Sequence, residues 1–278
     1  MQYFKIIIVY LNNNKYTAMK NTKKMLSYVA ATFIYLLAIF PATSQSQQEN
    51  FYCYLASHQY PAARAMIERP VIDIGFRDDF CTKEIMTKRI GFSYFRKSDL
   101  LLAGIAHCGY SKYGELKITL GYGRSFGKKF NIALSGTYIM NHAEHYANRH
   151  SFTIDLSALY VINPKFSLAI DLYNPIHLHY GITGAELIPM SFAIQAAYHT
   201  NNKLLGYLYC VKNLPGELDI GIGILYQPIQ NCIVQGICSI QKCGIGIHIP
   251  WKKLTFSIAA DWHYRISISP ESNIYYTL

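Results

Sequence analysis

Histidine and carboxylate side chains are the residues of this sequence that could bind a metal, and their densest group lies within residues 141–150. His142, Glu144, His145 and His150 fall in that stretch. A metal site needs three or four ligands that converge with fixed geometry, and a polar loop of this length provides no such scaffold. The spacing therefore favours surface histidines, and no metal ligand set is predicted.

The seven cysteines form a second candidate group, because thiols can bind metals or form disulfides. They lie at positions 53, 81, 108, 210, 232, 238 and 243, without Cys-x-x-Cys spacing. In an oxidising compartment some of them can pair. Cys232 and Cys238 have the same parity on one predicted strand, so they cannot bridge each other while that strand stays extended.

The sequence carries no motif set that is typical of an enzyme. Gly121-Tyr-Gly123 lies on a predicted strand with no helix after it, so it is not a phosphate-binding loop. Ser191 and Ser257 are interpreted as small inward-facing strand residues. The prediction is a non-enzymatic protein without a cofactor.

The elements that position the remaining charged residues are β-strands, and the clearest pair spans residues 113–140. Apolar side chains occupy every second position of 113–124, and 129–140 repeat the pattern after a short break. Strand side chains alternate between two faces, so this is a hairpin with one apolar face and one small or polar face. Each arm has the length of about ten residues that a tilted strand needs to cross a bilayer.

The same alternation continues along the chain and predicts an antiparallel transmembrane β-barrel of about 14 strands, with a range of 12–14. The expected strands are 70–77, 89–96, 100–109, 113–124, 129–140, 151–162, 165–173, 190–199, 203–212, 217–226, 230–239, 243–249, 253–265 and 272–278.

Loop lengths give the orientation of the predicted barrel. Breaks are short at 125–128, 163–164, 200–202, 227–229 and 250–252, and longer loops lie at 141–150 and 174–189. Outer-membrane barrels have short periplasmic turns and longer outer loops. This parity puts both ends of the strand array on the periplasmic side.

Composition favours a membrane barrel over a soluble protein. The chain has 278 residues, of which 51% are hydrophobic and 15% charged, below the usual quarter. No run of 18 apolar residues occurs after residue 45, so no transmembrane helix is expected there. The 24 tyrosines and 14 phenylalanines suit the aromatic girdles of a barrel. A secreted β-sandwich remains an alternative.

Inward-facing charged residues are the candidate functional positions of such a barrel. The alternation assigns these residues to the polar face: Glu115, Lys117, Asp155, Asp171, Asp219, Asp261, His263 and Arg265. Two interpretations stay open, a lumen network of mutually paired charges and a pathway for a substrate.

The first 45 residues carry a targeting pattern. Lys20, Lys23 and Lys24 precede the apolar run 26–40, which a small-residue cleavage site follows. The expected organisation is an extra leader over 1–18, a signal peptide over 19–44, an N-terminal segment or short plug over 45–69, and a β-barrel over 70–278. A short helix is expected near 62–67.

The net charge of +10 comes partly from this leader, which holds five lysines and no acidic residue. Removing them from the 26 basic residues leaves 21 against 16 acidic residues, a net charge of +5. That distribution is not the clustered basic footprint of a nucleic-acid binder.

Four groups of short motifs follow one another along residues 51–278. They are Phe51–Leu55 with Pro61–Arg64, Leu120–Gly123 with Phe126–Phe130, Tyr173–Pro175 with Ile188–Pro189, and His263–Pro270 with Ile274–Leu278. Their order resembles the Bacteroidota outer-membrane barrels related to the type IX secretion proteins PorV and PorQ, and more distantly the FadL-type fatty-acid channels. In this chain Ala65–Pro70 replaces the glycine-rich and Asn-Pro-Ala elements of the family, so a shortened plug is expected.

The resemblance implies a protein of the outer membrane of a Gram-negative bacterium, in contact with its lipid. Two roles follow: a part in protein export and surface attachment, with secretion-system proteins or cargo as partners, or passage of small hydrophobic molecules. The alternatives are a soluble secreted β-sandwich that binds a partner, and a barrel enzyme. An enzyme would need a Ser/His/Asp set near one rim, which cannot be assembled from this sequence.

Overall fold

We describe the protein from a computed structural model, whose described residues are 61–278 except 68, 177, 181–185 and 202. The expected leader 1–18, the expected signal peptide 19–44 and residues 45–60 of the N-terminal segment lie outside the described residues. The described chain begins with a short 3-10 helix, η2 (Pro61–Met66), where the sequence predicts a short helix. Among the described residues, no helix is long and apolar enough to span a membrane.

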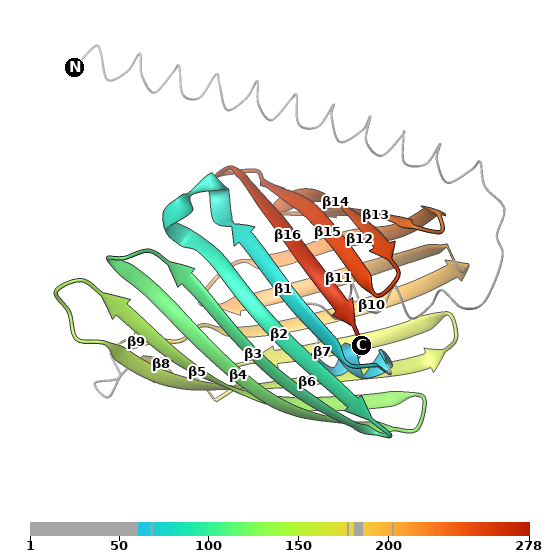
Figure 1. Ribbon diagram of the computed structural model, residues 1–278, viewed down its shortest axis with the longest axis horizontal. Coiled ribbons are helices and arrows are strands. Elements are labelled where there is room, and N and C mark those ends of the chain that lie inside the picture. Colours follow the sequence, from blue (N-terminus) through green and yellow to red (C-terminus); the bar gives the residue numbers. More distant parts are fainter. Residues whose placement is uncertain (1–60, 68, 177, 181–185, 202) are drawn as a thin grey trace, which may run out of the picture. The chain divides into compact units, whose positions relative to one another are not determined.

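Fourteen antiparallel strands close into a barrel, as the alternation predicts (Figure 1). They are β1 (Val71–Asp78), β2 (Met86–Arg96), β3 (Asp99–Gly109), β4 (Tyr113–Phe126), β5 (Phe130–Ala143), β6 (Arg149–Asn163), β7 (Phe166–Tyr173), β10 (Met190–Asn201), β11 (Leu204–Leu214), β12 (Leu218–Ile229), β13 (Cys232–Ser239), β14 (Lys242–Trp251), β15 (Leu254–His263) and β16 (Ile268–Thr277). Two short strands, β8 (His179–Tyr180) and β9 (Glu186–Leu187), form a separate sheet in the loop between β7 and β10.

The first and last strands close the ring. β1 pairs with β16, with Val71 opposite Thr277, and the backbone N–H of Leu278 donates to the carbonyl of Pro70 at 3.0 Å. The β-sandwich alternative is therefore wrong, because its two sheets would keep separate edges.

Alternation of side chains along each strand separates the two faces of the barrel wall. On β5, Leu134 is 53% exposed whereas the next residue, Ser135, is 4% exposed. Their partners across the β4–β5 ladder are Tyr122 and Gly121, which follow the same rule. The apolar set therefore points outward and the small or polar set points into the barrel.

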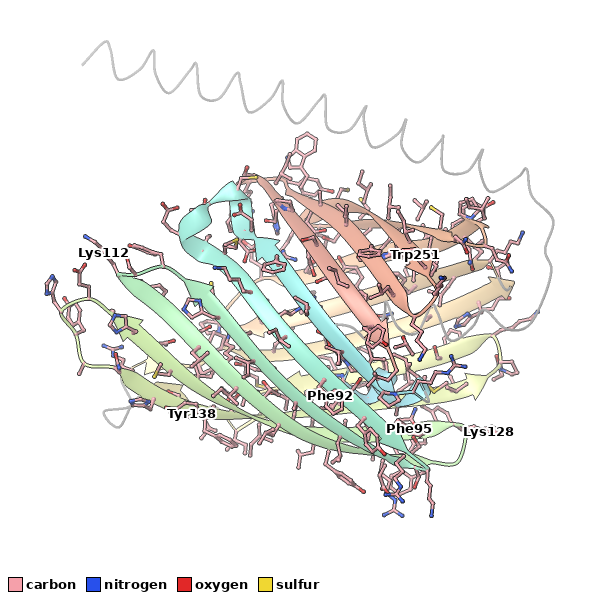
Figure 2. The ribbon with its side chains drawn as sticks, viewed as in Figure 1. Phe92, Phe95, Lys112, Lys128, Tyr138 and Trp251 are labelled. Atoms are coloured by element: carbon pink, nitrogen blue, oxygen red, sulfur yellow. The ribbon has the colours of Figure 1, made fainter. Side chains whose placement is uncertain are left out.

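The outward face is apolar over most of its height. Aliphatic side chains that are about half exposed or more include Ile90, Leu101, Ile105, Leu120, Leu208, Ile222, Ile245 and Ile258. Exposed aromatic side chains near the strand ends include Tyr94, Tyr113, Phe126, Tyr138, Tyr160, Trp251 and Trp262. Figure 2 shows Lys112 and Lys128 at opposite ends of the barrel, beyond this apolar band.

The longest loops lie at one end of the barrel, and every connection at the other end is short. The turns at 97–98, 127–129, 164–165, 230–231 and 252–253 and the connection between β10 and β11 are on the same end as Leu278, because successive antiparallel strands alternate in direction. The connections at 79–85, at 144–148 and between β7 and β10 lie on the other end, together with short ones at 110–112, 215–217, 240–241 and 264–267. The first of these contains two short 3-10 helices, η3 (Asp79–Cys81) and η4 (Lys83–Ile85).

Two of the predicted breaks are wrong in position. Pro228 and Pro250 lie inside β12 and β14, each one residue before its strand ends. A register shift between Tyr226 and Ile229 accommodates Pro228, whose nitrogen cannot donate to the ladder. Proline therefore marks the approach to these turns rather than the turns themselves.

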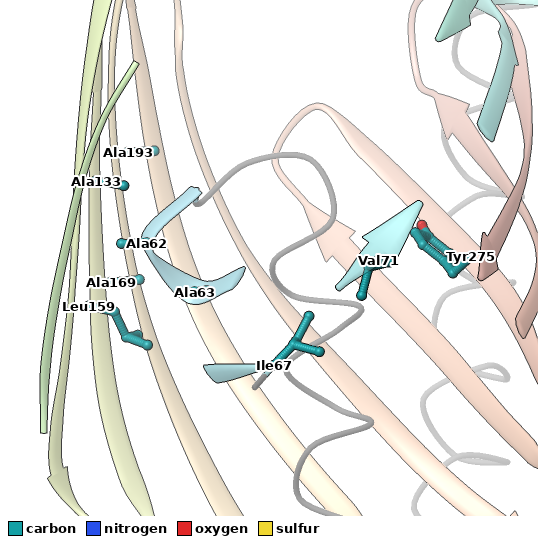
Figure 3. Close-up of a cluster of buried hydrophobic side chains, with 9 residues drawn as sticks. All are labelled: Ala62, Ala63, Ile67, Val71, Ala133, Leu159, Ala169, Ala193 and Tyr275. Carbon is teal, nitrogen blue, oxygen red and sulfur yellow. The ribbon is translucent and has the colours of Figure 1, made fainter. Parts of the chain in front are cut away.

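The helix η2 lies inside the barrel, against inward-facing side chains of the wall. Ala62 and Ala63 pack among Ala133, Leu159 and other buried side chains (Figure 3). The backbone N–H of Ala62 donates to Ser157 Oγ at 2.8 Å. Three alanines with nearly no exposed area allow the helix to approach the strands closely.

Candidate functional site

Two acidic residues on the inner wall are the centre of the candidate site. Asp155 on β6 and Asp171 on β7 project from neighbouring strands. Ser135 Oγ and Thr137 Oγ1 of β5 donate to Asp155 Oδ2 at 3.3 and 3.4 Å. Thr137 Oγ1 also lies 2.9 Å from Thr119 Oγ1 of β4. A polar row therefore crosses β4, β5 and β6 to the carboxylate.

This part of the wall carries an excess of negative charge. Oδ1 of Asp155 and Oδ1 of Asp171 are buried and have no hydrogen-bond partner in the described part of the chain. Glu115 and Lys117 on β4 pair with each other, with Lys117 Nζ 2.7 Å from Glu115 Oε1. One lysine thus accompanies three carboxylates on this part of the wall.

A cavity of about 490 Å³ lies between this wall and η2. The described residues that line it are Pro61, Glu115, Lys117, Thr119, Thr137, Asp155, Asp171, Tyr173, Ile188, Pro189, Ser191 and Asn213. Ile188 comes from the long loop after β7, which Asn174 holds by donating from Nδ2 to the carbonyl of Ile188 at 2.8 Å. Met66, at the other end of η2, accepts from Asn131 Nδ2 at 3.2 Å near the short-turn end. The helix therefore separates the cavity from that end.

A second group of charged residues lies on β14, β15, β16, β1 and β2. Arg77 Nη1 lies 3.1 Å from Glu271 Oε2, and Arg77 Nη2 lies 3.7 Å from Asp261 Oδ2. Arg89 Nη2 reaches Glu271 Oε1 at 3.2 Å, and Lys242 Nζ reaches Asp261 Oδ2 at 2.6 Å. Positive and negative groups alternate here, so this part of the wall is a paired network.

Sequence reasoning missed several members of that network. Asp73, Arg77 and Arg89 share parity with the buried positions of β1 and β2, so alternation was the available signal. Asp73 is 2% exposed and pairs with Arg64 of η2, whose Nη1 lies 2.9 Å from Asp73 Oδ1. Glu271 was missed because the last strand was predicted to start at residue 272, whereas β16 begins four residues before that, at Ile268.

The remaining candidates lie nearer the long-loop end. Asp219 Oδ1 on β12 accepts from the backbone N–H of Gln241 at 3.3 Å. His263 ends β15 and meets the ring of Phe80 edge-on, with centroids 5.1 Å apart. Asp261 belongs to the paired network.

Arg265 differs from the other candidates. It lies in the turn after β15, which ends at His263 rather than at residue 265 as predicted. Its side chain is 83% exposed and pairs with Glu217, with Arg265 Nη1 3.2 Å from Glu217 Oε1. The alternation of faces does not extend into a turn, so it gives no basis for an inward orientation of Arg265.

The arrangement can bind through hydrogen-bond acceptors and through shape. The β4–β7 wall offers carboxylates and hydroxyls to a solute in the cavity, and Pro61, Ile188 and Pro189 offer apolar surface. Volumes of about 300–1,000 Å³ are typical of small-molecule pockets. The site is therefore the size of a small-molecule pocket, with mixed polarity.

Comparisons with known proteins agree on the fold. No protein-family model and no curated protein matches the chain. Among solved structures, the P. putida toluene transporter TodX has a TM-score of 0.59 at 8% identity, over 80% of this chain and 92% of its own. The CymD monoaromatic hydrocarbon channel has a TM-score of 0.56 at 10% identity, over 86% and 94%. This chain thus has the β-barrel fold found in these channels.

Proposed function

We propose that the protein is a non-enzymatic outer-membrane β-barrel that passes small hydrophobic molecules. The observation that supports this most is a closed barrel with an apolar outer band and an internal cavity of about 490 Å³ beside a lumen helix. In the same proposal, residues 19–44 are a cleaved signal peptide of a Gram-negative bacterium, and 45–69 form a short plug.

The outer band is the reason for placing the barrel in a membrane. Monomeric soluble proteins rarely expose contiguous apolar patches beyond a few hundred Å², and here exposed Ile, Leu and aromatic side chains occur on strands all around the ring. The strands have 8–15 residues, which covers the length that a tilted membrane strand needs, about 9–11 residues.

The helix η2 and the cavity are the reasons for proposing passage of small molecules only. Ala62 and Ala63 place η2 in the lumen against β5 and β6, so the helix narrows the path for large solutes. The cavity between η2 and the long loops is large enough for a small solute. The structurally similar proteins TodX and CymD are named for toluene and monoaromatic hydrocarbons, which suggests this solute class for the first test.

Uptake of a labelled monoaromatic hydrocarbon by Gram-negative cells that produce the protein tests this function. The lipopolysaccharide layer of such cells is the relevant barrier, since plain lipid vesicles pass these molecules unaided. Thr119→Trp, which fills the cavity, is expected to lower uptake, whereas Leu120→Trp on the outer face leaves it unchanged. Equal uptake with and without the protein would refute the channel.

A second candidate is a part in protein export and surface attachment, as in the type IX secretion proteins. The observation that favours it is the fixed position of Pro61–Arg64, the segment that resembles this family. Arg64 pairs with Asp73 and Ala62 bonds to Ser157, so both sides of this segment are attached to the wall and the rim loops are left for partners. Recovery of cargo or secretion proteins with the tagged barrel from native outer membrane supports this role, and recovery of the barrel alone contradicts it.

A further inference from the structure

Two cysteines face each other across the β13–β14 ladder at the long-loop end of the barrel. Cys238 is directly opposite Cys243 in the strand register. Residues directly opposite in an antiparallel pair have Cα atoms about 4.5–5.5 Å apart, within the range of about 4.4–6.8 Å that a disulfide spans. Their side chains project on the same face of the sheet, which here is the outward face.

The sulfur atoms are already in close contact. Cys238 Sγ lies 2.7 Å from Cys243 Sγ, so a further approach of about 0.7 Å gives the S–S bond length of about 2.05 Å. A thiol is only a weak hydrogen-bond donor and acceptor, so a hydrogen bond gives little reason for this approach. No other two described cysteines have sulfur atoms in contact.

Tyr264, from the turn after β15, covers this pair. Its Oη lies 2.9 Å from Cys243 Sγ and 3.6 Å from Cys238 Sγ, and it donates to the carbonyl of Ser239 at 3.2 Å. Three chain segments thus meet at the two sulfur atoms, and a covalent bond there would tie β13 to β14 at this rim, under the hydroxyl of Tyr264.

We propose that Cys238 and Cys243 form a disulfide in the mature protein. The inference rests on the proposed outer-membrane location, because the chain reaches that membrane through an oxidising compartment. The oxidant is a protein disulfide of the periplasmic thiol-oxidase class. Its disulfide is attacked by one thiolate, and the resulting mixed disulfide is resolved by the second. Both S–H bonds are lost, one S–S bond forms, and two electrons and two protons reduce the donor to its dithiol.

The sequence provides a direct test, because trypsin cuts after Lys242, between the two cysteines. Cells are lysed in the presence of N-ethylmaleimide, which blocks free thiols, and their membranes are digested with trypsin without reductant. The expected result is peptide 213–242 joined to peptide 243–252, with the loss of two hydrogens, and separation on reduction. Cys238→Ser should abolish the joined pair. Cys232→Ser, which removes the other thiol of peptide 213–242, should retain it.

Alkylation of both Cys238 and Cys243 in the native membrane would overturn the proposal. Gel mobility with and without boiling is measured on the same sample, so a heat-modifiable barrel with free thiols refutes the disulfide alone. If the protein is not in the membrane fraction, the proposed location fails. Treatment of the purified protein with oxidised glutathione then tests whether Cys238 and Cys243 can form a disulfide. Joined peptides then support the geometry, and glutathionylated or unreacted thiols refute it.

Discussion

The stability cost of Leu120→Arg distinguishes a membrane barrel from a soluble one. Leu120 lies at the middle of β4, points outward and is 66% exposed. In a soluble protein, a substitution at such an exposed position changes stability by about 0.5 kcal/mol or less. On the lipid face near the bilayer midplane, arginine costs about 2–4 kcal/mol.

Two matched variants control for depth and for side. Ile229→Arg has the same 66% exposure but lies at the last residue of β12, where the expected cost falls to about 0–1 kcal/mol. Thr119→Arg lies one residue from Leu120, on the inner wall. It faces the cavity with Asp155 and Asp171, so we expect a smaller cost than at Leu120.

Reversible urea unfolding in lipid vesicles, followed by the fluorescence of Trp251 and Trp262, measures these differences. A loss of 2–4 kcal/mol corresponds to roughly a 30- to 700-fold lower folding equilibrium constant, since each 1.4 kcal/mol is tenfold. The expected order of stability is Ile229→Arg above Leu120→Arg, with Thr119→Arg also above Leu120→Arg. A Leu120→Arg barrel as stable in lipid as the other two would refute the lipid-facing assignment of β4.

Three further predictions concern the interior and the N-terminus. Arg89→Met should lower the free energy of unfolding by about 1–3 kcal/mol, because Glu271 loses a charged partner. The control is Arg124→Met, since Arg124 is exposed and lies 4.0 Å from Asp99; it should change that free energy by less than about 0.5 kcal/mol in the same urea assay. Equal losses in the two variants would contradict the prediction. Ala62→Leu should cost about 1–3 kcal/mol by overpacking and raise monoaromatic uptake by displacing η2; unchanged uptake would remove the helix as the barrier. Mass spectrometry of the native protein should find a mature N-terminus near Gln45, and a retained peptide from residues 26–40 would contradict signal cleavage.

The alternation along each strand was readable from sequence because it is a local property. Leu134 and Ser135 differ in parity, and parity alone assigns them to opposite faces of β5. The same rule predicted all 14 strands, including the two strands of the hairpin 113–140. Boundaries were less readable, because proline at 228 and 250 is tolerated inside β12 and β14 near their ends.

The pairing of side chains across the lumen was not readable from sequence. Arg77 meets Glu271 only because β1 closes on β16, and Arg64 meets Asp73 only because η2 turns back into the barrel. The sequence placed acidic residues on the inner face. It did not show which of them pair with basic residues and which surround the cavity. It also excluded a Cys232–Cys238 bridge without indicating that Cys238 meets Cys243.

Sequence by itself therefore indicated about 14 strands, within a range of 12–14, and determined the facing of residues such as Leu120 and the apolar outer band, since facing depends on a two-residue period within each strand. Tertiary structure alone decided closure through β1 and β16, the position of η2, the cavity beside Asp155 and Asp171, and the contact of Cys238 with Cys243. The physical reason is that these contacts depend on the register of every strand pair around the ring. A shift of one residue in one pair would turn each inward side chain of that strand to the outer face of the barrel.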